Sequence, residues 1–418
     1  MQGRHAEPNR SAVFSENVLS PARHPSARAR PFYSQAVRTE RFLFTGGLVG
    51  TEGDVPVIQG KSMAAQTRAV LENMKAVLGA VGLTFRNVLR VTVFITDRRD
   101  FQAMNSVYSE YFPVAPARTC STVAALYPGA KVAMSAVATF EGEAELVSTH
   151  GVAPPEDHPA LAGLAAGARK PFHCQGIRSA SLLCLSGVVG TEPQSAEIKD
   201  PTIEGQTRKA LHNMTETLAA AGLSARDVAN VLVLLQDRDD FEAMNRVYTE
   251  CFGDAPPARC CVTEGEHYPG SRIEIVAIAG FEGVAPILTP TVAAPHSHPT
   301  LPAGARPFYS QATRTPDLTF VSGMLGTEPG RFVIADTTIE GQTRRAMENM
   351  RQVLAADGLT LADLVSTTVF LRDHADYEAM TRVYAEHFPD SPPARSCAAM
   401  FGLHPGARVQ IGGVAARR

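Results

Sequence analysis

One block of sequence landmarks occurs three times along this chain of 418 residues, in the same order each time. The block opens with Pro-Phe, continues through Gly-Thr-Glu and Gln-Thr-Arg, and ends at Pro-Ala-Arg, whose arginines are Arg118, Arg259 and Arg395. These arginines lie 259 − 118 = 141 and 395 − 259 = 136 residues apart. A solenoid repeat has a period of roughly 20–50 residues, whereas this period has the length of a domain. The sequence therefore predicts three homologous domains in tandem, copies 1, 2 and 3, each able to bury its own core.

Two stretches rich in Pro, Ala and Gly separate the copies and have the composition of linkers. The predicted boundaries are an N-terminal arm over 1–30, copy 1 over 31–146, a linker over 147–168, copy 2 over 169–285, a linker over 286–305 and copy 3 over 306–418. The arm is Arg-rich and has no apolar run of a secretory signal, so we expect a disordered or strapping segment. A His-Pro pair precedes each copy, at His24, His158 and His298, which indicates that the linkers are ordered at their C-terminal ends.

Within each copy the hydrophobic pattern predicts a sheet and two helices. In copy 1, apolar residues recur at helical spacing over 62–80, and the run 88–95 is rich in β-branched residues that are typical of a strand. A second helix is predicted from residue 101 until Pro113 ends it, and two closing strands follow. The same order recurs in copies 2 and 3. The predicted fold class is therefore α+β, with one sheet per copy and two helices on one face.

Composition excludes several classes of function. The net charge is −3 and charged residues make up 19% of the chain, so no basic patch predicts nucleic-acid binding. No apolar run reaches the roughly 18 residues of a membrane span. Seven cysteines without a Cys-x-x-Cys pair indicate reduced thiols, and the 12 histidines form no metal-ligand pattern. We expect a cytoplasmic protein with no membrane, nucleic-acid or metal partner.

The most specific run is Tyr-Ser-Glu-Tyr-Phe-Pro-Val-Ala-Pro-Ala-Arg-Thr-Cys over 108–120, which is matched at 248–261 and 384–397. On these residues each copy resembles the RidA/YjgF family of reactive-intermediate deaminases, which act on enamines and imines. The resemblance covers nearly the whole chain outside the arm and linkers. It implies a chorismate-mutase-like domain that normally forms a homotrimer with a small-molecule cleft at each subunit interface. Three tandem copies then imply a monomeric, intramolecular pseudo-trimer with three non-identical clefts, and further self-association is left open.

The resemblance also implies the residues of the reaction. The arginine after Pro-Ala holds a carboxylate, because a guanidinium offers a planar bidentate fork. Glu274 matches the family's glutamate that positions water, whereas copies 1 and 3 have Ala133 and Gln410. Neither alanine nor a neutral amide can act as a carboxylate base, so at most one cleft keeps the hydrolytic residues. We predict Arg259 and Glu274 as the catalytic pair.

Other cleft positions that match the family are unevenly retained among the copies. The predicted substrate-binding residues are Arg118, Arg395, Tyr33, Tyr309, His173, Ser186, Gly187, Ser322, Gly323, Asn105, Asn245, Cys120, Cys261 and Cys397. The backbone of the Ser-Gly pairs is expected to bind the substrate carboxylate. The three thiols have no adjacent base in the sequence, so we expect packing rather than nucleophilic roles. Copy 2 alone has Glu264, Glu266 and His267 after its arginine. These residues are interpreted either as extra acid–base groups of a specialised reaction or as a solvated loop.

Three functions fit these residues. The first is a cofactor-independent hydrolase that deaminates a small 2-imino or enamine carboxylic acid at an inter-domain cleft. The second is a specialised pathway enzyme, an isomerase, cyclase or chorismatase-like hydrolase acting on an unstable carboxylate. The third is a non-catalytic carboxylate-binding protein. We predict the first, with a small-molecule carboxylate as partner and no cofactor.

Overall fold

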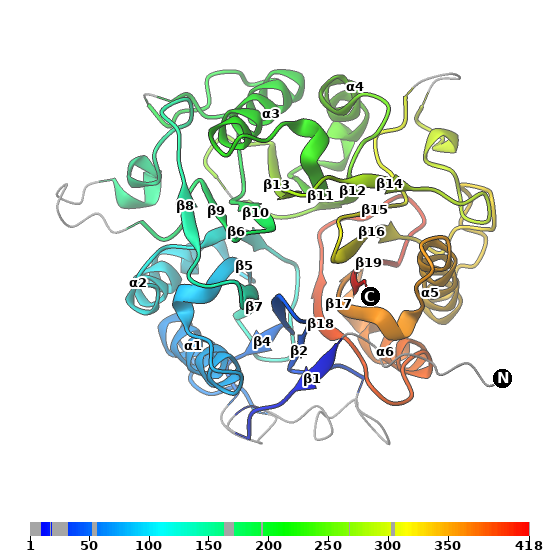
Figure 1. Cartoon of the computed structure of the whole chain (residues 1–418), viewed down its shortest axis with the longest axis horizontal. Coiled ribbons are helices and arrows are strands. Elements are labelled where there is room, and N and C mark those ends of the chain that lie inside the picture. Colours follow the sequence, from blue (N-terminus) through cyan, green and yellow to red (C-terminus); the bar gives the residue numbers. More distant parts are fainter. Residues whose placement is uncertain are drawn as a thin grey trace.

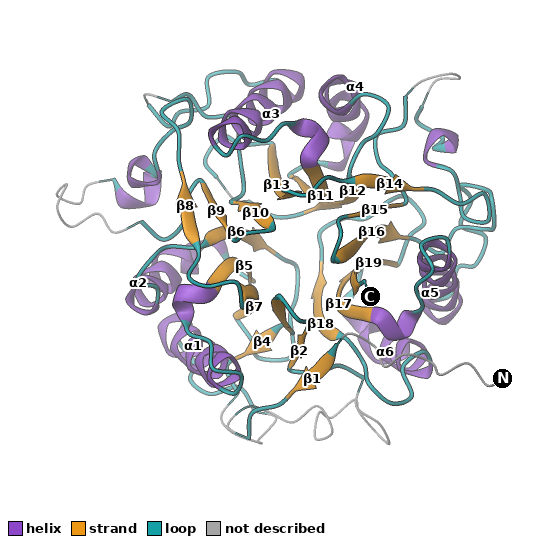
Figure 2. Ribbon diagram, in the orientation of Figure 1, coloured by secondary structure: helices purple, strands orange, loops and turns teal. Residues whose placement is uncertain are grey.

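The computed structural model describes residues 10–16, 18, 32–51, 57–162, 171–193, 195–266, 268–301 and 306–417. Three α+β units surround a central axis (Figure 1), with strands facing the axis and helices on the outside (Figure 2). The predicted fold class, three α+β domains in one intramolecular pseudo-trimer, is confirmed (Figure 1). Residues 1–9, 17 and 19–30 of the predicted arm, with His24, lie outside the described residues.

The three sheets share one strand order. The first runs β1-β2-β3-β7-β5-β6, with β4 paired to β7 off this path, the second β8-β9-β10-β13-β11-β12 and the third β14-β15-β16-β19-β17-β18. Only the last pair of each order, such as β5 and β6, is parallel. The strands of the first sheet are β1 (Ser11–Val13), β2 (Ala36–Arg38), β3 (Phe42–Thr45), β4 (Leu48–Val49), β5 (Val88–Ile95), β6 (Ala117–Thr122) and β7 (Val132–Thr139).

The second and third sheets repeat these elements. The second has β8 (Glu145–Val147), β9 (Gly176–Arg178), β10 (Leu182–Leu185), β11 (Val228–Leu235), β12 (Ala258–Thr263) and β13 (Ile273–Gly280). The third has β14 (Ala285–Ile287), β15 (Ala312–Arg314), β16 (Leu318–Met324), β17 (Leu364–Leu371), β18 (Ala394–Ala399) and β19 (Val409–Ala416).

Two helices cover the outer face of each sheet (Figure 2). They are α1 (Met63–Gly79) and α2 (Phe101–Tyr111), α3 (Ile203–Ala220) and α4 (Phe241–Phe252), and α5 (Ile339–Ala355) and α6 (Tyr377–Glu386). The long helices begin after a hydroxyl N-cap, since the side chains of Ser62, Thr202 and Thr338 accept a backbone N–H three residues on. None of the described helices is both long and apolar enough to cross a membrane.

The first strand of each sheet comes from a segment that the sequence assigned elsewhere. We placed β1 in the arm, β8 across the end of copy 1 and its linker, and β14 across the end of copy 2 and its linker. In the structure they pair with β2, β9 and β15, at the edges of the three sheets. Three residues are too few to show a strand periodicity, so main-chain pairing decided their place. The arm and linkers therefore belong to the sheets that follow them.

Apolar side chains from all three copies pack around the axis. Phe42, Leu182 and Leu318, which begin equivalent strands, are fully buried in one shared cluster. A main-chain bond is repeated at each interface, where the backbone N–H of Ser34, Cys174 or Ser310 donates to the proline carbonyl of Pro393, Pro116 or Pro257. Because burial of apolar area drives association, the copies form one closed ring rather than separate beads.

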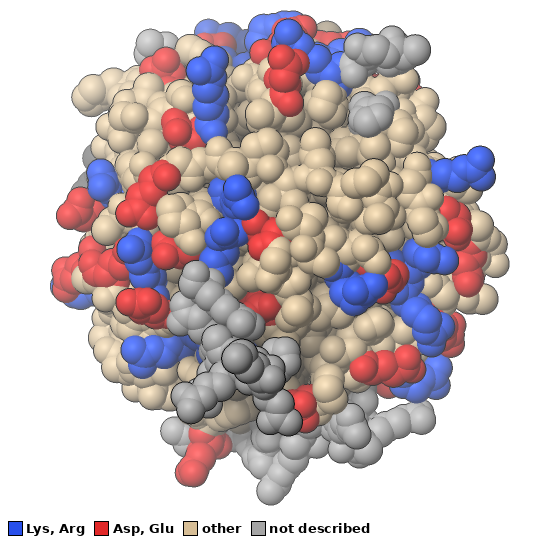
Figure 3. Space-filling view, turned by 45° about the vertical axis from the view of Figure 1, so that its right-hand side comes forward, with Lys and Arg blue, Asp and Glu red and all other residues tan. Residues whose placement is uncertain are grey.

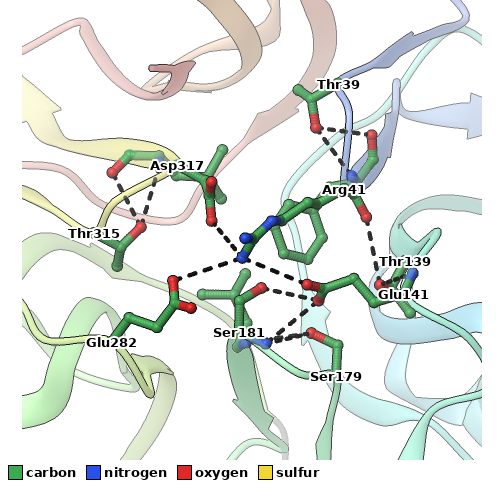
Figure 4. Close-up of polar contacts among 12 residues, drawn as sticks. Thr39, Arg41, Thr139, Glu141, Ser179, Ser181, Glu282, Thr315 and Asp317 are labelled. Carbon is green, nitrogen blue, oxygen red and sulfur yellow. Dashed lines mark hydrogen bonds and ion pairs between the residues drawn. The ribbon is translucent and has the colours of Figure 1, made fainter. Parts of the chain in front are cut away.

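One ion cluster marks how far the copies have diverged at the axis. Arg41, Ser181 and Asp317 precede equivalent strands, and in a homotrimer this position would hold three identical side chains. Here Arg41 lies 3.0 Å from Asp317 and 3.6 Å from both Glu141 and Glu282, while Glu141 accepts a 2.9 Å bond from the Ser181 hydroxyl (Figure 4). The cluster joins all three copies with non-identical groups.

Candidate functional site

Each of the three predicted arginines is buried at an interface between copies. Arg118, Arg259 and Arg395 are the second residues of β6, β12 and β18, and only 5–6% of each is exposed. Each guanidinium carbon lies over the ring of the Pro-Phe motif in the next copy around the ring: Arg118 over Phe172 at 4.4 Å, Arg259 over Phe308 at 4.5 Å and Arg395 over Phe32 at 4.4 Å. Among the described residues, no carboxylate forms an ion pair with any of them. A buried cation of this kind favours an anionic ligand.

The second helix of each copy orients the guanidinium. Nη1 of Arg118 donates to Oδ1 of Asn105 at 2.6 Å, and Nη1 of Arg259 donates to Asn245 at 2.7 Å. In copy 3, Arg395 donates to the hydroxyl of Tyr377 at 3.0 Å. Asn105 and Asn245 are buried behind the arginines rather than in the cleft wall. We therefore assign them to positioning the guanidinium, not to contacting a substrate.

Each arginine opens into a cleft shared with the next copy. The first cleft, between copies 1 and 2, is lined by Arg118, Cys120, His173, Ser186, Gly187 and Glu274 and has a volume of about 110 Å³. The second, between copies 2 and 3, is lined by Arg259, Cys261, Tyr309, Gly323 and Gln410 and has about 60 Å³. The third, between copies 3 and 1, is lined by Arg395, Cys397, Tyr33, Gly47 and Ala133 and has about 80 Å³. These volumes lie below the roughly 300 Å³ of the smallest drug-sized pockets, so each cleft has room only for a small ligand.

The structure separates the pair that the sequence combined. Arg259 lies in the second cleft, whereas Glu274 lies in the first, opposite Arg118 of copy 1. The reason is topological, because β12 forms one edge of the second sheet and β13 lies beyond β11. One strand meets copy 3 and the other meets copy 1. The predicted pairing of Arg259 with Glu274 is therefore corrected to Arg118 with Glu274.

A glycine and a threonine hold Glu274 in the first cleft. Its Oε1 accepts a 2.5 Å hydrogen bond from the hydroxyl of Thr119 of copy 1. A Cβ on Gly187 would lie only 1.7 Å from Oε1, so only glycine leaves room for this carboxylate. Glu274 is 7% exposed. The carboxylate is therefore fixed by both copies in a buried position facing the cleft.

The equivalent strand positions in the other clefts lack a carboxylate. The ladder pairs Leu234 with Glu274, Phe370 with Gln410 and Phe94 with Ala133. Gln410 packs against Gly323 and donates weakly to its carbonyl at 3.4 Å. Glu274 is the one carboxylate that lines any of the three clefts among the described residues.

Both serines of the Ser-Gly pairs, and the backbone N–H of Gly187, form hydrogen bonds across the interfaces. The Ser186 and Ser322 hydroxyls accept the backbone N–H of Arg118 and Arg259, at 2.9 and 2.7 Å. The backbone N–H of Gly187 donates to the Arg118 carbonyl at 2.9 Å. The expectation that this N–H binds a substrate carboxylate is wrong for Gly187, because the interface already uses it. Gly187 contributes to the site through its lack of a side chain, which leaves room for the Glu274 carboxylate.

The rings of His173, Tyr33 and Tyr309 are uncharged in the clefts. Burial, with a smaller contribution from Arg118, lowers the pKa of His173 to about 3. Burial also raises the pKa of the Tyr33 and Tyr309 hydroxyls well above their usual range. The first cleft therefore has the neutral imidazole of His173 at the position where the other two clefts have the protonated phenols of Tyr33 and Tyr309.

The cleft thiols are protonated as well. Burial raises the pKa of Cys120 and of Cys397 to about 11 and raises that of Cys261. This agrees with a packing role, since the thiolate is the nucleophile. No cluster of three or more potential metal-ligating side chains occurs in the described part of the chain.

The acidic turn of copy 2 is only partly solvated. Glu264 is 1% exposed, where copies 1 and 3 place Val123 and Met400 in an apolar cluster, while Glu266 is exposed. The Glu266 carbonyl accepts a 2.7 Å bond from the hydroxyl of Thr122 of copy 1. His267 lies outside the described residues. The turn thus braces the interface beside the first cleft.

Three further residues line the first cleft that the sequence did not single out as ligand-binding: Arg98, His158 and Tyr268. His158 stacks on Phe101 with ring centroids 5.9 Å apart, and burial lowers its pKa to about 2. The recurring His-Pro of the linkers was the available signal, because His298 lines the second cleft in the same way. The linkers therefore form part of the cleft walls.

Comparison with known proteins agrees with this geometry. A family model described as Endoribonuclease L-PSP matches residues 23–140, 164–281 and 301–417, which is most of the chain. Such a closed ring of three α+β units with interfacial arginine clefts defines a fused trimeric member of that class. The chain belongs to the L-PSP family, which includes the RidA and RutC proteins, and carries three copies of its domain.

Individual relatives match one copy at a time. A RutC family protein of Pyrococcus horikoshii is 40% identical over 27% of this chain and 90% of its own length. The 3-aminoacrylate deaminase RutC of Acinetobacter baylyi is 36% identical over 28% and 94%, and the human 2-iminobutanoate/2-iminopropanoate deaminase is 35% identical over 29% and 88%. A chorismatase crystal structure has a TM-score of 0.55 and 17% identity, over 79% of this chain and 93% of that one, which shows a shared fold.

Proposed function

We propose that the protein hydrolyses a small 2-imino or enamine carboxylic acid to the 2-oxo acid and ammonia, and does so in the first cleft. The observation that carries this proposal is the meeting of Arg118 with Glu274 across the interface of copies 1 and 2. Relatives named as deaminases of 3-aminoacrylate and of 2-iminobutanoate support the class of substrate.

In this mechanism the substrate carboxylate binds the Arg118 guanidinium, which Asn105 holds in place. Glu274, oriented by Thr119, accepts a proton from water as the water oxygen attacks the imine carbon. The carboxyl group then passes the proton to the substrate nitrogen, which gives a carbinolamine. The hydroxyl proton of the carbinolamine next moves through the Glu274 carboxylate to the nitrogen, the C–N bond breaks as the C=O bond forms, and ammonia leaves. One water enters and one 2-oxo acid and one ammonia are released. An enamine first takes a proton on its β-carbon to become the imine.

Two features support a small-molecule ligand over a nucleic acid. The clefts are small, and their arginines are buried rather than displayed. On the face in Figure 3, basic and acidic side chains are interspersed, without the broad basic surface that phosphate backbones require. The third cleft, with Ala133 opposite Arg395, supports a second role of carboxylate binding without turnover there.

The test is ammonia release from 2-iminobutanoate generated in place by an amino-acid oxidase, measured above the rate in buffer. Glu274→Gln keeps the shape of the side chain and removes the base, so we expect kcat to fall about 10²- to 10⁴-fold. Gln410→Ala, at the equivalent strand position of the second cleft, is the matched control and keeps the wild-type rate. A wild-type rate in Glu274→Gln contradicts the proposal.

A further inference from the structure

A second guanidinium lines the first cleft beside Arg118. Arg98 lies in the short turn between β5 and α2, and its guanidinium carbon is 3.6 Å from the centroid of the Phe101 ring. Arg118 lies 5.6 Å from the same centroid. Both arginines line the cavity that contains Glu274. One aromatic ring thus positions two cations at one cavity.

The acidic residues next to Arg98 in the chain are engaged elsewhere. Asp97 binds Arg99, with Oδ2 2.6 Å from the guanidinium, and Asp100 binds Lys131 at 2.8 Å. Among the described residues, no carboxylate forms an ion pair with Arg98. Burial lowers the pKa of the Arg98 and Arg118 guanidinium groups, and Arg98 lowers that of Arg118 further, whereas the Glu274 carboxyl acts in the opposite direction on both. An anion that contacts both would offset this desolvation and repulsion.

The third cleft differs at this position. His374 replaces Arg98 there, and its ring stacks flat on Tyr377 with centroids 5.5 Å apart. The second cleft keeps the arginine as Arg238, 3.8 Å from the Phe241 ring, but has Gln410 in place of the acid. The first cleft is therefore the one that combines two guanidinium groups with a carboxylate.

We propose that Arg98 selects dicarboxylate substrates, so that the first cleft hydrolyses the imine or enamine of a four- or five-carbon dicarboxylic amino acid in preference to a monocarboxylate. Arg118 binds the carboxylate next to the imine carbon, and Arg98 binds the distal one. This specificity rests on the proposed hydrolytic function. Arg98 acts in binding and takes no part in proton transfer.

The test compares kcat/KM for 2-iminosuccinate, generated from L-aspartate by an oxidase, with kcat/KM for 2-iminobutanoate. Because a hydrogen-bonded contact to a charged group contributes about 10- to 100-fold, we expect the wild type to favour 2-iminosuccinate by about that factor. Arg98→Met keeps an apolar stem over Phe101 and should remove the preference, mainly by raising KM for the dicarboxylate. Arg98→Lys should restore part of it.

Arg99→Met is the control. It removes the same charge one residue farther along the chain, and the Arg99 side chain is 90% exposed. It should keep the wild-type preference. Equal kcat/KM for the two imines in the wild type, or an equal loss for both in Arg98→Met, overturns the assignment of Arg98.

A binding measurement separates this inference from the hydrolytic one. Calorimetric titration with 2-oxoglutarate and with 2-oxobutanoate needs no turnover. Tighter binding of 2-oxoglutarate by about 10-fold or more, lost in Arg98→Met but kept in Arg238→Met, supports the site of Arg98 and Arg118 even if neither imine is hydrolysed. Equal or weaker binding of 2-oxoglutarate overturns it even if imines are hydrolysed.

Discussion

The first and second clefts have nearly the same frame and differ in the group that performs chemistry. In both, an arginine is held by a helix asparagine, its backbone N–H donates to a serine of the next copy, and its guanidinium lies over the phenylalanine of that copy's Pro-Phe motif. At the facing strand position the first cleft has Glu274 and the second has Gln410. The arginine and the phenylalanine beneath it are part of the interface in all three copies, so packing preserves them. The carboxylate is present in the first cleft alone among the described residues of the three clefts.

This comparison changes what the repeated arginine means. Its recurrence in three copies favoured a functional reading from sequence, and the structure supplies an additional, structural reason for the recurrence. The number of repeated arginines therefore does not indicate how many clefts are catalytic. The residue that faces each arginine across the cleft indicates it.

Replacing the arginine of the first or of the second cleft should give the largest difference in kcat/KM for imine hydrolysis. Arg118→Met leaves the substrate carboxylate without its partner, and loss of one member of a buried charge pair costs about 2–5 kcal/mol, so kcat/KM for imine hydrolysis should fall at least about 30-fold. Arg259→Met removes the equivalent group of the second cleft and should leave hydrolysis at its wild-type level. Loss of activity in Arg259→Met with activity retained in Arg118→Met would restore the pairing that the sequence suggested.

A transplant of the acid should give a smaller gain. Thr119, which holds Glu274, corresponds to Cys260 in the second cleft, so both groups must be moved. In a Glu274→Gln background, Cys260→Thr with Gln410→Glu should raise hydrolysis about 10-fold above that background, since general base catalysis is worth at least that much when geometry is imperfect. Gln410→Glu alone is the matched control and should gain less. No gain in the double replacement would show that the two frames differ in more than this position.

The smallest effect concerns stability and pH. The folded-state pKa of His173 is about 3, below its ordinary value of 6.5, so the unfolded chain binds the proton first as the pH falls. The stabilising contribution is complete above pH 6.5 and is lost as the pH falls toward the folded-state value. Between about pH 7 and about pH 5.5 this histidine should account for about 1 kcal/mol of the loss in unfolding free energy.

His173→Tyr, the ring that copies 1 and 3 have at this position, removes the titrating group. Urea unfolding at the two pH values should show a correspondingly weaker decline in that variant. An unchanged decline would mean that His173 is not buried as a neutral ring.

The helices and longer strands of each copy could be predicted from local hydrophobic patterns, and the cleft residues from the resemblance to the family. The run 88–95 forms β5 with the predicted bounds. The helix predicted over 62–80 is α1, and Ser62 is its N-cap. The first strand of each sheet could not be predicted, because three residues carry no periodicity and their place depends on a neighbour's edge.

The site was predicted by residue type but not by partnership. Arg118, Arg259 and Glu274 were all identified, yet which arginine faces Glu274 depends on which edge of the second sheet meets copy 1. That information lies in the assembly, not in the order of residues along the chain. Gly187 shows the same limit, because its role as the space for a carboxylate side chain depends on β13 lying beside it.

The most direct test is a crystal structure of the chain with 2-oxobutanoate, the expected product. The carboxylate should lie on the Arg118 guanidinium with the C2 carbonyl within hydrogen-bonding distance of the Glu274 side chain, in the cleft between copies 1 and 2. Ligand held by Arg259 or Arg395 while the Arg118 cleft stays empty would contradict the account.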